Sequence, residues 1–70
     1  MKNLLKVERA KKNITQAELA KLISVSRQTI NAIELGRYVP STLLSLKIAH
    51  VFGTTVNEIF ELEEADWQKK

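Results

Sequence analysis

Apolar residues recur along this chain at intervals of three and four positions, in short runs separated by polar residues or glycine. Such spacing places the apolar side chains on one face of a helix, whereas a strand needs strict alternation. No internal repeat or low-complexity tract interrupts the pattern. It predicts an all-α chain with helices over about residues 4–12, 16–23, 27–35, 41–52 and 56–60.

Residues that favour helix ends stand at the expected boundaries. Thr15 and Ser26 each precede an apolar run, and their hydroxyls suit hydrogen bonds from the free N–H groups of a first helical turn. Glu18 follows Thr15 by three positions, which completes the pattern of a capping box. Gly36 and Gly53 follow the third and fourth predicted helices, where glycine favours the left-handed conformation that ends a helix. These signals define the second and third helices best.

The second and third predicted helices lie too close together for an ordinary loop. Their cap residues, Thr15 and Ser26, stand eleven positions apart, which leaves three or four residues for the turn. Each helix has an apolar face, formed by Leu19, Ala20 and Ile23 and by Val25, Ile30 and Ile33. Two short helices that share a core across such a turn form a helix-turn-helix.

The outward positions of the third predicted helix carry Arg27, Gln28, Asn31 and Ala32. Paired donors and acceptors on arginine, and on glutamine or asparagine, match the edges of guanine and adenine in the major groove, and alanine leaves room for a thymine methyl. The same residues also suit a merely solvated helix face. Their place at the start of the second helix of a helix-turn-helix favours a DNA recognition helix.

Six segments spread over residues 4–62 carry a family resemblance. They are VERA (7–10), ITQ (14–16), VSRQTINAIE (25–34), YVPS (38–41), LKIA (46–49) and VNEIF (56–60). In this order and spacing they resemble the Cro/cI-type (XRE-like) helix-turn-helix family of phage and bacterial repressors, and especially its short single-domain members.

The resemblance implies a compact five-helix fold like the lambda repressor DNA-binding domain, formed by residues 1–70 as one domain. It implies a transcriptional regulator, a repressor, that binds double-stranded DNA with sequence specificity, as a homodimer on a palindromic operator. No enzyme activity, cofactor, metal or small-molecule ligand is expected, and the expected location is the cytoplasm. The alternative is an antitoxin-type module that binds a partner protein as well as its own operator.

The resemblance also implies which residues contact DNA. These are Gln16, Ser26, Arg27, Gln28, Thr29, Asn31, Ala32, Arg37 and Tyr38. Gln16 matches a family glutamine that binds a phosphate and braces the recognition helix. Arg27 is expected to contact either a base or a phosphate. Tyr38 is expected either to contact the sugar-phosphate backbone or to cover the core.

Two further positions have an architectural role. Arg9 and Glu34 match positions that form a largely buried ion pair between the first and third helices in this family. Removing one partner of such a pair leaves an uncompensated charge and costs about 3–5 kcal/mol. Ser24 occupies a turn position where many relatives have glycine. A left-handed backbone there costs serine about 1 kcal/mol.

The net charge of +3 is unevenly distributed along the chain. Residues 1–50 carry a balance of +6, whereas residues 51–70 carry a balance of −3 that includes Lys69 and Lys70. A basic body suits contact with phosphates, and an acidic C-terminal segment should face away from DNA. Small soluble proteins also scatter charges in this way by chance, so the charge alone does not decide the function.

The fourth predicted helix is apolar over a wider sector than one core contact needs. The excess predicts a dimer interface that includes Leu44, Ile48, Val51, Val56, Ile59, Phe60 and Leu62. The alternative is a small domain that buries this helix deeply without forming a dimer.

The segment after the fifth predicted helix alternates apolar and charged residues, which predicts a short strand. By the resemblance this strand pairs with residues 2–4 in a two-stranded ribbon. The tail, residues 61–70, is expected to take part in dimerisation.

Several classes of function are disfavoured by composition. Cysteine is absent and His50 is the only histidine, so a disulfide, a thiolate metal site or a nucleophile–histidine pair is not expected. No apolar run approaches the roughly 20 residues of a membrane span, and Lys6 interrupts the apolar N-terminal patch of a would-be signal peptide. A DNA-binding protein fits the sequence better than an enzyme or a membrane protein.

Overall fold

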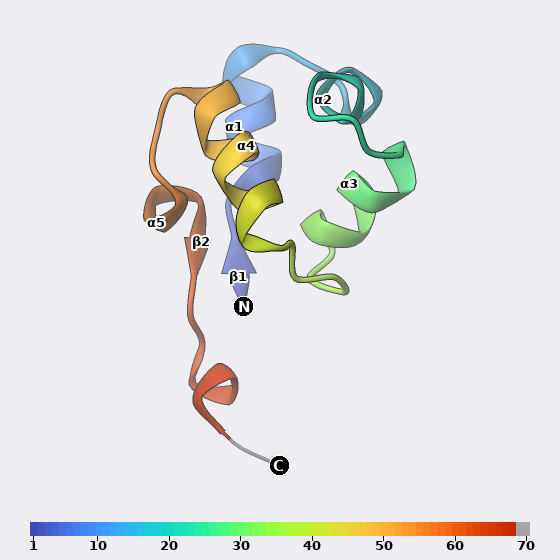
Figure 1. Cartoon of the computed structure of the whole chain (residues 1–70). Helices are drawn as coiled ribbons and strands as arrows, with labels where there is room; N and C mark the ends of the chain where they lie inside the picture. Colours follow the sequence, from blue (N-terminus) through green and yellow to red (C-terminus); the bar gives the residue numbers. More distant parts are fainter. Residues whose placement is uncertain (69–70) are drawn as a thin grey trace.

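The computed structural model describes residues 1–68 and is mostly helical (Figure 1). Its elements are β1 (Lys2–Asn3), α1 (Leu5–Lys12), α2 (Gln16–Leu22), α3 (Arg27–Glu34), α4 (Thr42–Phe52), α5 (Val56–Ile59), β2 (Phe60–Glu61) and the 3-10 turn η1 (Glu64–Trp67). The five predicted helices are confirmed in order and nearly in length. The turn η1 was not predicted, because its sequence EADW has no apolar period that indicates a helix. Lys69 and Lys70, which belong to the predicted dimerisation tail, lie outside the described residues.

The core draws at least one side chain from each α-helix. Its largest fully buried members are Leu5 of α1, Leu19 of α2, Ile30 and Ile33 of α3, Ile48 of α4 and Ile59 of α5. Burying side chains of this size is the main favourable term for so small a fold. The helices therefore hold one another in place through a shared cluster.

The predicted helix starts are confirmed by their caps. The Thr15 hydroxyl accepts a hydrogen bond from the Glu18 N–H at 3.0 Å, and the Thr15 N–H donates to the Glu18 carboxylate at 2.7 Å, as a capping box requires. The Ser26 hydroxyl accepts from the Thr29 N–H at 3.1 Å. Gly53 ends α4 in the left-handed conformation. Both helices of the helix-turn-helix thus begin after residues whose side chains cap the first turn.

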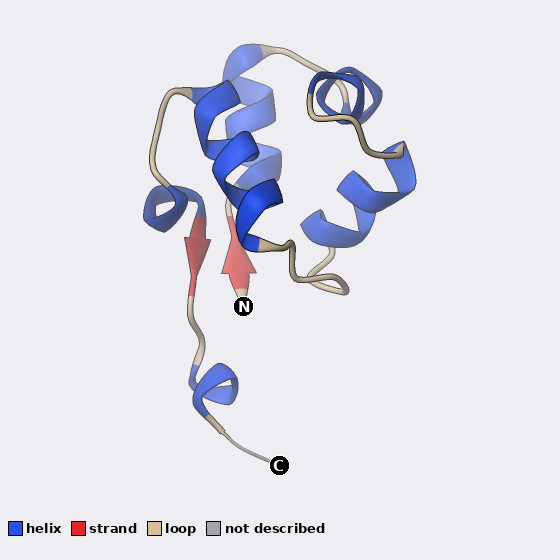
Figure 2. Cartoon of the chain, viewed as in Figure 1, coloured by secondary structure: helices blue, strands red, loops and turns tan. Residues whose placement is uncertain are grey.

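The predicted ribbon between the two ends of the chain is confirmed (Figure 2). β1 and β2 pair antiparallel, with Lys2 opposite Glu61 and Asn3 opposite Phe60. The Asn3 side chain donates to the Ile33 carbonyl at 2.9 Å, and its oxygen accepts from the Leu5 N–H at 3.1 Å. The ribbon is therefore anchored to the end of α3 and the start of α1.

The expected dimer residues divide into two groups. Four of them are buried in the core of the single chain, at most 8% exposed: Leu44, Ile48, Ile59 and Phe60. These side chains pack in the core of the chain itself, so we correct their assignment from a dimer contact to the core; Phe60 also lines the edge of a surface hollow. Val51 and Val56 are half-buried, and Leu62 is 56% exposed. The helical wheel identified the apolar sector but not which part faces the chain's own core.

Within residues 1–68, two residues other than glycine adopt the left-handed conformation. Ser24, in the turn between α2 and α3, has φ 62°, and Asn13, after α1, has φ 57°. Both side chains are exposed. Ser24 therefore adopts the backbone conformation that costs serine more than glycine.

We expect Ser24→Gly to raise the free energy of unfolding by about 0.5–1 kcal/mol, because glycine relieves the left-handed strain but loses more backbone entropy. Asn13→Gly is the matched control and should gain less, since asparagine tolerates this conformation. Urea unfolding at neutral pH measures both. An equal gain at the two positions, or a loss at Ser24, would contradict this account of the turn.

Candidate nucleic-acid interface

A four-residue turn, residues 23–26, joins α2 to α3 at a steep angle. Figure 1 shows α2 nearly end-on and α3 from the side, so their axes cross steeply. Ile23 is buried, Ser24 reverses the chain, and the Val25 N–H donates to the Ala20 carbonyl at 2.9 Å. The turn thereby sets α3 across α2, as in a helix-turn-helix.

The α3 helix buries one face and exposes the other. Ile30 and Ile33 lie in the core, Thr29 and Ala32 are half-buried, and Arg27, Gln28 and Asn31 are exposed. The three exposed residues, hereafter the α3 face, all lie in the first two turns of the helix. A polar surface at the start of a short helix that projects from the molecule suits entry into a major groove.

Four other candidate residues lie in α3 or at its two ends. Arg37 and Tyr38, in the loop after α3, are both exposed, Tyr38 to 46%. Ser26 and Thr29 are bonded to each other, with their hydroxyl oxygens 3.0 Å apart, and together form the cap of α3. Those two hydroxyls are therefore used in hydrogen bonds at the start of α3.

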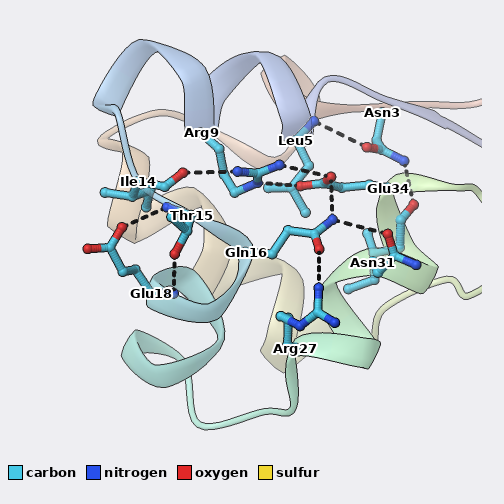
Figure 3. A network of polar contacts seen from close by, with 11 residues as sticks. Asn3, Leu5, Arg9, Ile14, Thr15, Gln16, Glu18, Arg27, Asn31 and Glu34 are labelled. Atoms are coloured by element: carbon cyan, nitrogen blue, oxygen red, sulfur yellow. Dashed lines mark hydrogen bonds and ion pairs between the residues drawn. The ribbon is translucent and has the colours of Figure 1, made fainter.

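Arg9 and Glu34 form an ion pair between α1 and α3, as the resemblance implies (Figure 3). Arg9 Nε donates to Glu34 Oε2 at 2.6 Å and Arg9 Nη2 donates to Glu34 Oε1 at 3.2 Å, a bidentate arrangement. The side chains are 15% and 6% exposed. Arg9 Nη1 also donates to the Ile14 carbonyl at 2.9 Å. The pair thus links α1, the α1–α2 connection and α3.

Gln16, the first residue of α2, joins this ion pair to the α3 face. Its amide Nε2 donates to Glu34 Oε1 at 3.0 Å and to Asn31 Oδ1 at 3.1 Å. Its Oε1 accepts from Arg27 Nη1 at 3.4 Å. The bracing role expected for this glutamine is visible in these contacts. Both amide hydrogens are already used, so in this arrangement the side chain has no donor left for a phosphate.

The ion pair holds both partners in their charged forms. Burial by itself raises the pKa of the Glu34 carboxyl, but hydrogen bonds from Arg9 and Gln16 outweigh it, and the pKa lies below its ordinary value. The hydrogen bond to Glu34 raises the pKa of the Arg9 guanidinium. Glu34 is therefore a carboxylate, which only accepts hydrogen bonds.

The acidic C-terminal segment is divided: Glu58 and Glu61 lie away from α3, whereas Glu63 lines a hollow with Glu34, Leu35 and Gly36 at the end of α3. Figure 1 shows α2 and α3 on one side of the molecule and α5 and β2 on the other. Glu58 of α5 and Glu61 of β2 are exposed on that far side. The acidic residues of α5 and β2 therefore lie where they would not repel DNA at the α3 face.

Two other kinds of site were sought over residues 1–68. This part of the chain has no group of three or more His, Cys, Asp or Glu side chains that could hold a metal ion. Its helices are all too short or too polar to cross a membrane.

We expect Arg9→Met to lower the free energy of unfolding by about 3–5 kcal/mol, because it leaves the Glu34 carboxylate buried without its main partner. The double variant Arg9→Met/Glu34→Leu removes both charges and should recover most of that loss. Urea unfolding measures both proteins. A double variant no more stable than Arg9→Met would contradict the assignment.

The same pair gives the sign of a pH effect. Because the pKa of Glu34 is lowered on folding, its contribution is fully present above the ordinary value of 4.5 and is lost as the pH falls through the folded value. The double variant should therefore lose less stability than the parent below about pH 4.5. Asp66, whose pKa is also lowered, titrates in both proteins and cancels in the comparison.

Comparison with known proteins agrees with this geometry. A family model described as helix-turn-helix matches residues 5–59. The chain is 55% identical over 64 residues to an HTH-type transcriptional regulator of Methanocaldococcus jannaschii, covering 91% of this chain and 97% of that protein. It is 47% identical over 64 residues to the HTH-type transcriptional regulator YgzD of Bacillus subtilis, with 91% and 97% coverage.

A phage protein and a solved structure are also similar. The ImmF control region 10 kDa protein of Bacillus phage phi105 is 35% identical over 71 residues, covering 94% of this chain and 79% of that protein. The crystal structure of the clp gene regulator ClgR from Corynebacterium glutamicum superimposes with a TM-score of 0.72 at 33% identity, over 77% of this chain and 57% of that one. The chain belongs to the Cro/cI-type helix-turn-helix family of DNA-binding transcriptional regulators.

Proposed function

We propose that this protein represses transcription by binding a palindromic operator in double-stranded DNA as a homodimer. The observation that carries the proposal is the α3 face, in which Arg27, Gln28 and Asn31 project from the first two turns of α3. Each α3 enters a major groove, and the two half-sites lie about one helical turn apart. Such a protein acts in the cytoplasm, where its DNA target is found.

The candidate residues divide between bases and backbone. Gln28 is exposed, and its amide has both a donor and an acceptor, which suits an adenine edge. Arg27 lies within reach of Gln16, and its remaining donors suit a guanine edge or a phosphate. Arg37 and Tyr38 follow α3 in an exposed loop and suit the sugar-phosphate backbone. Ala32 is half-buried and leaves room for a thymine methyl.

A second copy of the chain is the proposed occupant of an exposed apolar surface beside α4. We call it the α4 surface and define it by Val39, Leu46 and Val56. Val39 is 61% exposed, while Leu46 is 56% exposed. Val39, Leu46 and Val56 line a largely apolar hollow of 340 Å³ with Met1, Pro40 and Phe60.

Symmetry favours this occupant. A two-fold dimer places the same patch of each subunit against the other, and it presents two copies of α3 to paired half-sites. A contiguous apolar surface on a small protein also favours association over exposure to water. Val56 and Leu62 remain dimer candidates from the original set, and Leu46 and Val39 are added because they are exposed.

The division between base and backbone contacts is tested by salt. Gln28→Ala should weaken binding to a selected operator by about 1–3 kcal/mol while leaving non-specific binding and its salt dependence unchanged. Arg37→Ala should weaken both kinds of binding and reduce the slope of log K against log salt by about one. Both residues are exposed, so neither change should disturb the fold. Identical profiles for the two variants would show that one assignment is wrong.

The proposed dimer surface is tested by a matched pair of substitutions. Leu46→Lys places a charge on the α4 surface and should raise the dimer dissociation constant at least about tenfold, because burial of one leucine is worth about 1.5–3 kcal/mol. Leu22→Lys adds the same charge at a similarly exposed leucine in α2, outside that surface, and should not change it. Sedimentation equilibrium measures both. A monomeric parent protein at tens of micromolar, or equal effects of the two substitutions, would refute the proposed interface.

A further inference from the structure

Glu34 determines which hydrogen-bonding group Asn31 of the α3 face presents to a ligand. This residue is an ionised carboxylate, and only 6% of its side chain is exposed. A carboxylate has no hydrogen to donate, so the atom that Gln16 turns towards Glu34 Oε1 at 3.0 Å must be its NH₂ group. The negative charge of Glu34 therefore determines how the Gln16 amide is turned, with its NH₂ group towards the carboxylate.

The orientation of the Gln16 amide in turn determines the orientation of the Asn31 amide. Gln16 Nε2 carries two hydrogens, and the second one points to an Asn31 side-chain atom 3.1 Å away. That atom must be an acceptor, and so it is Oδ1. Figure 3 shows the Asn31 oxygen directed to Gln16 and its nitrogen turned away. Asn31 is exposed, so the group that it presents to an incoming ligand is its NH₂ donor.

We propose that Asn31 acts on the operator as a donor only, and that Glu34 enforces this through Gln16, which makes Gln16 a positioning residue. The inference rests on the proposed binding of double-stranded DNA. An asparagine that reads adenine must accept from N6 and donate to N7 at the same time. Here the carbonyl oxygen is directed at Gln16 and the NH₂ group is turned outward, so the group that Asn31 offers to DNA suits bases that present acceptors.

The base preference follows from the edges in the major groove. Guanine presents two acceptors, O6 and N7, and thymine presents O4. Cytosine presents only the N4 donor, and adenine presents one donor beside its single acceptor. The position under Asn31 should therefore select guanine or thymine. This differs from the adenine preference that an unconstrained asparagine would have.

Binding-site selection on random duplex DNA tests the inference. The position read by Asn31 is identified as the one whose preference is lost in Asn31→Ala. In the parent protein this position should favour guanine or thymine over adenine and cytosine by about tenfold, the scale of one good side chain–base pair. Gln16→Met removes the amide of Gln16 and frees the Asn31 carbonyl, so the preference should shift to adenine by a similar factor.

Arg27→Met is the matched control for Gln16→Met. It removes the Arg27 contact to Gln16 but keeps the two bonds that Gln16 Nε2 makes to Glu34 and Asn31. The preference at the Asn31 position should therefore stay unchanged, while preference elsewhere in the site weakens. Circular dichroism confirms that each variant is folded.

Three outcomes would overturn the inference while leaving the proposed function intact: adenine preferred by the parent protein at the Asn31 position, no change with Gln16→Met, or no position altered by Asn31→Ala. A parent protein that selects no sequence at all would refute the proposed function instead. A measurement without DNA separates these cases further. In NMR spectra of the free protein, the side-chain amide hydrogens of Gln16 should exchange with water severalfold more slowly than those of exposed Gln28, and equal rates would contradict the network.

Discussion

The bidentate ion pair between Arg9 and Glu34 is the interaction on which the DNA-facing side of this protein depends. It links α1 to α3 at 2.6 and 3.2 Å, and Glu34 also accepts from Gln16 of α2. One carboxylate of α3 thus binds side chains of both α1 and α2. A buried pair of this kind adds little net stability over apolar residues. Its value here lies in orientation, since it determines where the polar groups of α3 point.

Different parts of the molecule form the core, the turn, the DNA-facing helix and the α4 surface. The core joins all five α-helices through a shared set of mainly aliphatic side chains, and the residues of the α3 face do not belong to it. The turn at Ser24 accepts backbone strain so that α3 crosses α2. The acidic residues of α5 and β2 lie on the far side, where they do not repel phosphates. The α4 surface lies outside the helix-turn-helix and is free for a second subunit.

Helix caps could be predicted from the sequence, whereas contacts between side chains far apart in the sequence could not. The caps at Thr15 and Ser26 involve residues three positions apart, so spacing alone revealed them. The burial of Ile48 and Ile59 depends on which neighbours fill the space beside an apolar face, and a helical wheel does not contain that information. The donor-outward state of Asn31 needs the positions of Glu34 and Gln16 in space. Residue types alone suggested an adenine contact.

Methylation protection on a selected operator tests the central claim most directly, because the reagent distinguishes the grooves. Guanine N7 lies in the major groove and adenine N3 in the minor groove. If the α3 face enters the major groove as a symmetric pair, the protein should protect N7 in two clusters about 10 base pairs apart and leave N3 reactive at the same base pairs. Protection of adenine N3 with guanine N7 left reactive, or protection that is independent of sequence, would contradict the account.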